Sequence, residues 1–121
     1  MKIRLHEIEF GANEPDKSKA FYEFVLKLTT TVDKDNLKVF NSDNTGVDFN
    51  ASKHYAPCVF VTSFITDDIN SIIQNLHSSG INYDGPKASH LGMLCVEFKD
   101  PDDNIIKVNQ PTDTSPSWLK V

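Results

Sequence analysis

Two acidic side chains near the start of the chain, Glu7 and Glu9, are the first candidates for chemistry. They alternate with Ile8 and Phe10 in the segment from Arg4 to Ala12, and this period of two predicts a half-buried strand. Both carboxylates then share one face of that strand. A carboxylate needs burial or a like-charged neighbour to act as a base near neutral pH, and Glu9 is such a neighbour for Glu7.

The other reactive side chains are dispersed along the sequence. Neither a nucleophile motif nor a glycine-rich phosphate loop is present. Cys58 and Cys95 lie in apolar segments without CxxC spacing, which predicts two reduced core thiols. Of the four histidines, His90 is the best placed to reach a ligand, because it lies in the loop 87–92; the others are His6, His54 and His77.

The length and net charge of the chain limit which classes of protein it can belong to. The chain has 121 residues and a net charge of −5, which predict one soluble domain (1–121) that needs no metal or disulfide to build a core. The acidic balance argues against a nucleic-acid partner. No segment has the apolar length of a membrane span, and the first residues do not form a signal peptide, so we expect a cytoplasmic protein without membrane contact.

Elements of a repeated unit must position these residues. After the first strand, Pro15 begins a predicted helix with an apolar stripe formed by Ala20, Phe21, Phe24, Val25 and Leu28. Short strands are predicted at 29–32, 37–40 and 46–51, separated by turn residues. The first half of the chain therefore reads β-α-β-β-β.

The second half repeats that order. A strand is predicted at 57–66, then a helix that Asp67 or Asp68 caps and Gly80 ends, then strands at 81–83, 93–99 and 105–109. The buried positions expected from these periods are Ile8, Phe10, Phe21, Phe24, Val25, Phe64, Ile69, Ile72, Ile73, Leu76 and Phe98. The chain is thus predicted to be a tandem of module one (3–52) and module two (57–110), followed by a tail (111–121) in which Trp118 hints at docking.

Two stretches carry a family resemblance. The segment Asp16–Leu28, DKSKAFYEFVLKL, is similar to the first helix of the vicinal oxygen chelate superfamily, also called the glyoxalase/bleomycin-resistance/dioxygenase superfamily. Asp100–Val108, DPDDNIIKV, resembles its closing Asp-Pro-Asp-Gly-Asn turn and strand. The resemblance implies an α+β fold in which tandem β-α-β-β-β modules form a curled mixed-sheet cup with the helices on its convex side.

The resemblance also implies where a metal site would lie. The superfamily takes one metal ligand from the first and last strand of each module, and these positions map to Glu7, to Asp48 or Asn50, to Val61 and to Lys107. A divalent cation needs three or more oxygen or nitrogen donors. Because Val61 supplies no donor and Lys107 brings a positive charge, we expect no bound metal; Lys107 is instead expected opposite Glu7, in a structural ion pair or holding a ligand anion.

Polar side chains over an apolar floor form the candidate ligand site. Its members are Glu7, Glu9, Asp48, Asn50, Val61, Ser63, Cys95, Glu97 and Lys107, with Val59 and Met93 completing the floor. Four carboxylates against one lysine suggest a ligand with a cationic or hydrogen-bond-donating part, although a solvated sheet face has the same composition.

Two functions follow from the resemblance. The first is a glyoxalase/bleomycin-resistance-like protein that binds a small molecule without a cofactor and without metal-dependent catalysis. The alternative is a glyoxalase-like lyase or isomerase with zinc, nickel or manganese and with Glu7 as metal ligand or general base. We expect a homodimer with the segment around Trp118 protected, and the cups form either within one chain or across two.

Overall fold

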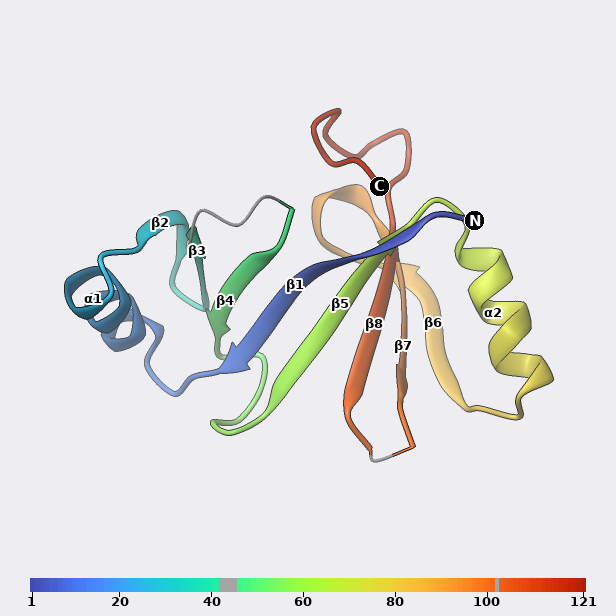
Figure 1. Ribbon diagram of the computed structural model, residues 1–121, viewed down its shortest axis with the longest axis horizontal. Coiled ribbons are helices and arrows are strands. Elements are labelled where there is room, and N and C mark those ends of the chain that lie inside the picture. Colours follow the sequence, from blue (N-terminus) through green and yellow to red (C-terminus); the bar gives the residue numbers. More distant parts are fainter. Residues whose placement is uncertain (42–45, 102) are drawn as a thin grey trace. The chain divides into compact units, whose positions relative to one another are not determined.

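The computed structural model describes residues 1–41, 46–101 and 103–121 and has the predicted α+β order of elements (Figure 1). The order β-α-β-β-β occurs twice, and a mixed arrangement of strands accompanies one helix in each repeat. The chain divides into an N-terminal unit, His6–Val61, and a C-terminal unit, Met1–Leu5 with Thr62–Val121. The fold class and the tandem order are therefore confirmed. In the described residues neither helix has the length and hydrophobicity needed to cross a membrane.

The N-terminal unit orders its strands β2-β3-β4-β1. Strand β1 pairs with β4 in parallel, whereas β3 pairs in antiparallel fashion with both β2 and β4. Helix α1 begins at Pro15, whose missing N–H costs nothing at a first helical position. The elements are β1 (Ile3–Gly11), α1 (Pro15–Val25), β2 (Thr29–Lys34), β3 (Leu37–Asn41) and β4 (Asp48–Ser52).

The C-terminal unit repeats this arrangement in the order β5-β8-β7-β6. Helix α2 starts where the Asp68 carboxylate accepts a hydrogen bond from the Ser71 backbone N–H at 3.1 Å, and it ends before Gly80, which has φ +67°. Both signals were predicted. The elements are β5 (Phe60–Thr66), α2 (Ile69–Ser78), β6 (Tyr83–Ala88), the 3₁₀ turn η1 (His90–Gly92), β7 (Leu94–Lys99) and β8 (Ile105–Gln110).

The core of the C-terminal unit agrees with the sequence periods. Ile69 and Leu76 on α2 are buried against Val96 and Val108 of the sheet. The remaining predicted positions are partly buried and pack against the same cluster; they are Phe64, Ile72, Ile73 and Phe98. The even-numbered residues of β5, β7 and β8, such as Phe64 and Phe98, therefore face α2. The odd-numbered residues of these strands face the other way.

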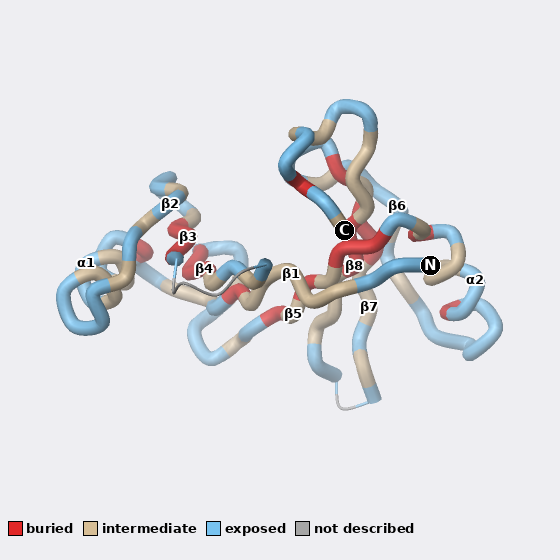
Figure 2. Tube along the Cα trace, turned by 45° about the horizontal axis from the view of Figure 1, so that its top comes forward, coloured by how far each residue is buried: buried red, intermediate tan, exposed pale blue. Residues whose placement is uncertain are grey.

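The predicted stripe of the first helix is wrong. Phe21, Phe24 and Val25 are 51%, 77% and 55% exposed, and Figure 2 shows most of α1 as exposed. Phe10, also expected to be buried, is 40% exposed. Only Pro15 is fully buried among the residues of α1.

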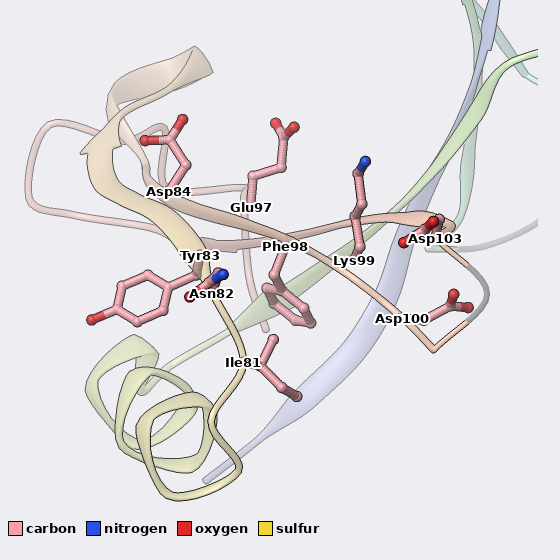
Figure 3. A pocket seen from close by; sticks show the side chains of 9 residues that line it. All are labelled: Ile81, Asn82, Tyr83, Asp84, Glu97, Phe98, Lys99, Asp100 and Asp103. Atoms are coloured by element: carbon pink, nitrogen blue, oxygen red, sulfur yellow. The ribbon is translucent and has the colours of Figure 1, made fainter.

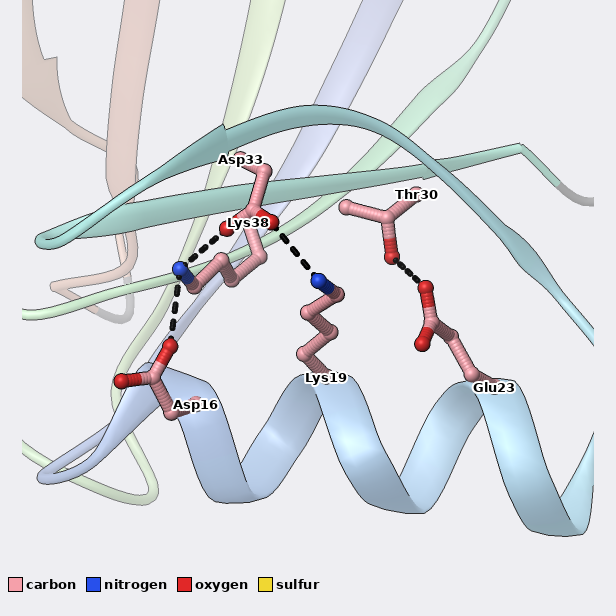
Figure 4. Close-up of polar contacts among 6 residues, drawn as sticks. All are labelled: Asp16, Lys19, Glu23, Thr30, Asp33 and Lys38. Carbon is pink, nitrogen blue, oxygen red and sulfur yellow. Dashed lines mark hydrogen bonds and ion pairs between the residues drawn. The ribbon is translucent and has the colours of Figure 1, made fainter.

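Polar contacts and one tyrosine hold α1 to its sheet instead. Lys19 binds Asp33 at 2.7 Å, the buried Lys38 ammonium bridges Asp33 and Asp16, and Thr30 donates to Glu23 at 2.6 Å (Figure 4). The Tyr22 ring packs on Phe40 and Phe49 at centroid distances of 5.0 and 4.9 Å. The helix thus turns a mixed face to the sheet, since these side chains find partners on β2 and β3.

The tail docks through Leu119 rather than through Trp118. Leu119 is buried with Ile65 and Met93, and Val121 packs beside it, whereas Trp118 is 69% exposed. Thr112 donates to the Gly92 carbonyl at 2.6 Å. A Cβ at Gly92, which has φ +70°, would meet the Thr114 hydroxyl at 2.4 Å, so this residue must stay small for the tail to pass. Met93, predicted to be part of the ligand floor, therefore lies under the tail.

Candidate functional site

The polar residues of the N-terminal unit gather on the sheet face opposite α1. Phe10 contacts Phe49 at 5.2 Å, and Phe49 contacts Tyr22 of α1, so the even positions of β1 and the odd positions of β4 face the helix. The predicted register, with Ile8 and not Glu7 on the helix side, is confirmed. Cα pairing places Glu7 beside Asp48 and Glu9 beside Asn50. We call Glu7, Glu9, Asp48, Asn50 and Ser52 the polar face of the N-terminal unit.

Asn50 links the two strands through its side chain. Its Nδ2 donates to Glu7 Oε2 at 2.8 Å, and the residue as a whole is 2% exposed. Its Oδ1 is buried and has no hydrogen-bond partner among the described residues. Asp48, the neighbouring candidate, is exposed. The expected polar cluster therefore forms around Asn50 rather than around Asp48.

Two further residues, Ser52 and His54, join this face without having been predicted. The buried Glu9 carboxylate accepts a hydrogen bond from the Ser52 hydroxyl at 2.7 Å, and the same oxygen lies 3.2 Å from His54 Nδ1. The His54 backbone N–H donates to Ser52 Oγ at 3.2 Å, which closes the network. The signal for Ser52 was the alternation of Asp48, Asn50 and Ser52 along β4. His54 lies in the turn after β4, where the strand period does not apply, so the sequence carried no such signal for it.

The candidates of the C-terminal unit lie on the face opposite α2. Leu94, Val96 and Phe98 pack toward the helix, so Cys95 and Glu97 point the other way. Glu97 and Lys107 are paired across β7 and β8. Ser63 belongs to the same face of β5, and its buried hydroxyl has no partner among the described residues. These residues, Ser63, Cys95, Glu97 and Lys107, form the polar face of the C-terminal unit.

Cys95 is a poor nucleophile in this setting. Burial raises the pKa of its thiol, and Glu97 acts in the same direction, although Lys107 and Lys87 oppose them. A thiol held protonated does not supply the reactive thiolate. Both cysteines are free, and Cys95 is buried as predicted. The prediction of a core thiol is wrong for Cys58, which is exposed. Cys95 therefore belongs to the apolar floor rather than to any catalytic group.

Whether a metal fits at the positions implied by the resemblance depends on Val61 and Lys107. Val61 is buried and offers no donor atom, and Lys107 offers an ammonium that repels a cation. In the part of the chain that the structure describes, no three His, Cys, Asp or Glu side chains form a group that could hold a metal ion. The residues present do not fit the metal. The expected approach of Lys107 to Glu7 involves both units and stays a prediction.

A pocket of about 430 Å³ lies at the β6–β7 edge of the C-terminal unit (Figure 3). In the figure Glu97 and Lys99 project to one side of β7, while Phe98 and Ile81 project toward α2. Of the predicted site residues only Glu97 lines it; the others in its wall are Ile81, Asn82, Tyr83, Asp84, Phe98, Lys99, Asp100 and Asp103. Asp102 of the closing motif is outside the described residues.

No family model matches the chain, and no curated protein matches it. Solved structures do. A methylmalonyl-CoA epimerase in complex with methylmalonyl-CoA and NH4⁺ aligns with TM-score 0.70 and 14% identity over 96% of this chain and 100% of its own. A glyoxalase/bleomycin resistance protein/dioxygenase superfamily member from Vibrio splendidus aligns at 0.68 and 14%, over 91% and 100%. A chain from Legionella pneumophila described as NAD-dependent benzaldehyde dehydrogenase aligns at 0.69 and 17%, over 88% and 98%.

Proposed function

Because the chain has the fold of the glyoxalase/bleomycin-resistance/dioxygenase superfamily, we propose that it binds a small molecule through its polar faces, without metal-dependent catalysis. The observation that carries the proposal is the donor set at the positions implied by the resemblance. Glu7 keeps a carboxylate there, but Val61 and Lys107 replace two donors with a hydrocarbon and a cation. Convergent polar groups over buried apolar residues remain, which is the usual composition of a ligand site.

A ligand screen tests the proposal in two steps. Fragments of varied charge are added to the metal-free protein, and binding is followed by NMR and by thermal stabilisation. We expect several fragments to bind, and we expect Glu7→Ala to weaken them while Glu14→Gln, an exposed carboxylate at the start of α1, does not. Elemental analysis then measures metal. Stoichiometric metal in the purified protein, or stabilisation by Zn²⁺, Ni²⁺ or Mn²⁺ that disappears in Glu7→Ala, would contradict the proposal.

The second candidate is a glyoxalase-type lyase or isomerase. The observation that favours it is the Glu7 carboxylate, which the Asn50 amide holds in one orientation, as a general base requires. Its test is exchange of a substrate proton for deuterium in D₂O. Exchange that is lost in Glu7→Gln would establish the enzyme, and binding without exchange would support the first proposal.

The proposal includes a cellular compartment and an oligomeric state. We place the protein in the cytoplasm, since a reducing compartment preserves the free thiols Cys58 and Cys95. We also expect it to act as a homodimer, and the exposed apolar residues of α1 support that expectation.

A further inference from the structure

An unpaired buried acceptor points to the chemistry of the ligand. Asn50 Oδ1 is buried and has no partner in the described residues, while Nδ2 of the same amide donates to Glu7 Oε2 at 2.8 Å. An ionised carboxylate accepts hydrogen bonds and cannot donate them, so this contact fixes which amide atom is nitrogen and which is oxygen. The oxygen is therefore a buried acceptor that lacks a hydrogen-bond donor, which is rare in a folded protein and needs an explanation such as a bound donor.

The charge around this oxygen favours a cationic donor. Glu9 is the cross-strand partner of Asn50, and Glu7 lies two residues earlier on the same face of β1. Glu9 is buried, and its Oε2 lies 3.2 Å from His54 Nδ1. Ser52 adds a hydroxyl that is already used as a donor to Glu9. A positively charged N–H group would donate a hydrogen bond to Asn50 Oδ1 and would also be attracted by the Glu7 and Glu9 carboxylates.

We propose that Glu7, Glu9 and Asn50 form a receptor for the protonated amine or amidinium group of the ligand. This inference rests on the proposed function and deepens it by naming the ligand class. Asn50 Oδ1 accepts a hydrogen bond from the N–H group of the ligand. Glu7 fixes the orientation of the Asn50 amide, and the Glu7 and Glu9 carboxylates supply the negative potential. A bound water also donates hydrogen bonds but gains nothing from the charge of the carboxylates, so charge separates the two occupants experimentally.

The probes are three molecules of equal size and different charge: n-propylammonium chloride, 1-propanol and sodium propionate. Each is titrated into the full-length chain labelled with ¹³C and ¹⁵N. The readout is the side-chain amide signal of Asn50, which is assigned through its bonded carbons and checked by its loss in Asn50→Leu. We expect the ammonium probe to shift this signal with a dissociation constant at least about tenfold below that of the alcohol, because a charge-assisted hydrogen bond is about twice as strong as a neutral one. Propionate should cause no shift.

Matched variants locate the effect. In Glu7→Gln the ammonium preference should fall to less than about threefold, since the amide loses both its fixed orientation and a neighbouring charge. Glu14→Gln removes an exposed carboxylate, and Asn75→Leu replaces an exposed asparagine on α2; both should keep the preference. Glu7→Gln preserves the size of the side chain, so the test stands even where Asn50→Leu fails to fold.

Equal affinity for propylammonium and propanol would overturn the inference. A crystal soaked in the ammonium probe that retains an ordered water on Asn50 Oδ1 would also overturn it. The outcomes separate the two proposals: neutral or anionic fragments that bind best leave small-molecule binding intact and remove the cationic class, whereas a chain that binds no fragment of any charge contradicts the proposed function itself.

Discussion

Lys107 and Val61 lie at two of the metal-ligand positions that the family resemblance implies, and neither supplies a donor for a metal. A cation about 4 Å from a divalent metal costs about 4 kcal/mol per unit of metal charge, even at an effective dielectric of about 20. Lys107→Glu removes that repulsion and adds a carboxylate, and Val61→His adds a nitrogen donor. We predict that the double variant gains Zn²⁺ or Ni²⁺ binding, measured by calorimetry and elemental analysis.

Each single variant is the control for this gain, because neither restores more than one donor. Adding Glu7→Ala to the double variant should abolish the new metal affinity. A double variant that folds and still binds no metal would show that the positions implied by the resemblance are assigned wrongly, and not only the function.

Asp33 gives a prediction about pH. Hydrogen bonds from Lys19 and Lys38 lower the pKa of its carboxyl to about 2, from 3.8. A depressed pKa in the folded state stabilises the protein above the unfolded value, and that contribution is lost as the pH falls from about 4 through about 2. We predict that Asp33→Asn lowers the melting temperature at pH 6 by a small amount and that the difference from the wild type vanishes near pH 2.

Chemical shifts of the Asp33 carboxyl carbon measure the pKa directly. Asp35→Asn, in the adjoining exposed turn, is the matched control and should show no such pH dependence. A normal Asp33 pKa, or an unchanged difference between pH 6 and pH 2, would show that the contacts of Lys19 and Lys38 are absent in solution.

The site could be predicted from sequence only where its residues follow the strand period. Glu7 and Glu9 were found because alternate positions of β1 carry them. Ser52 and His54 were missed, because their contact with Glu9 spans 43 and 45 residues and depends on the parallel pairing of β1 with β4. Binding by any of these residues stays a prediction.

Among the elements, the helices show why the second repeat was easier to predict than the first. In α2 the apolar spacing, the Asp68 cap and the Gly80 stop all indicate the same helix, so its buried face could be predicted from the sequence. In α1 the face toward the sheet is set by Lys19 and Glu23, whose partners Asp33 and Thr30 are on β2. An ion pair and a hydrogen bond to another element leave no periodic signal in the helix, and the apolar period was therefore misleading.

The bounds of strand β6 were predicted wrongly for a different reason. The sequence predicted a strand at 81–83, whereas β6 runs from Tyr83 to Ala88 and includes Gly85 and Pro86. These two residues are typical of turns, and a strand tolerates proline at a sheet edge, where no ladder hydrogen bond is lost. β6 lies at the end of the strand order of its unit, and its pairing with β7 shifts register between Asp84 and Lys87.

The tail gives a prediction at the same scale. Leu119 is buried against Ile65 and Met93, so Leu119→Ala removes packed methyl groups and leaves a cavity. We expect it to lower the free energy of unfolding by about 2–3 kcal/mol in urea denaturation. Leu91→Ala, at an exposed leucine, is the matched control and should change it by less than about 0.5 kcal/mol. Equal effects of the two variants would mean that the tail is not docked.

For the whole molecule, the exposed side of α1 bears on the oligomeric state. Phe21, Phe24, Val25 and Leu26 are all exposed at the end of this helix. Apolar side chains at positions i, i+3 and i+4 of a helix, as Phe21, Phe24 and Val25 are, lie on one side of it. Burying them in an interface gains about 25 cal/mol per Å². Light scattering at micromolar concentration should therefore give a mass of about twice 13.6 kDa.

Phe24→Lys tests whether α1 forms that interface. An ammonium at the most exposed of these positions would have to be desolvated on both sides of a two-fold contact, so the variant should be monomeric at concentrations where the wild type is a dimer. Ile81→Lys places the same charge at an exposed apolar position of the C-terminal unit and should leave the dimer intact. If Phe24→Lys stays dimeric, the interface lies elsewhere; if the wild type is monomeric throughout, each cup must form within one chain, and a ligand should then bind with an affinity that is independent of protein concentration.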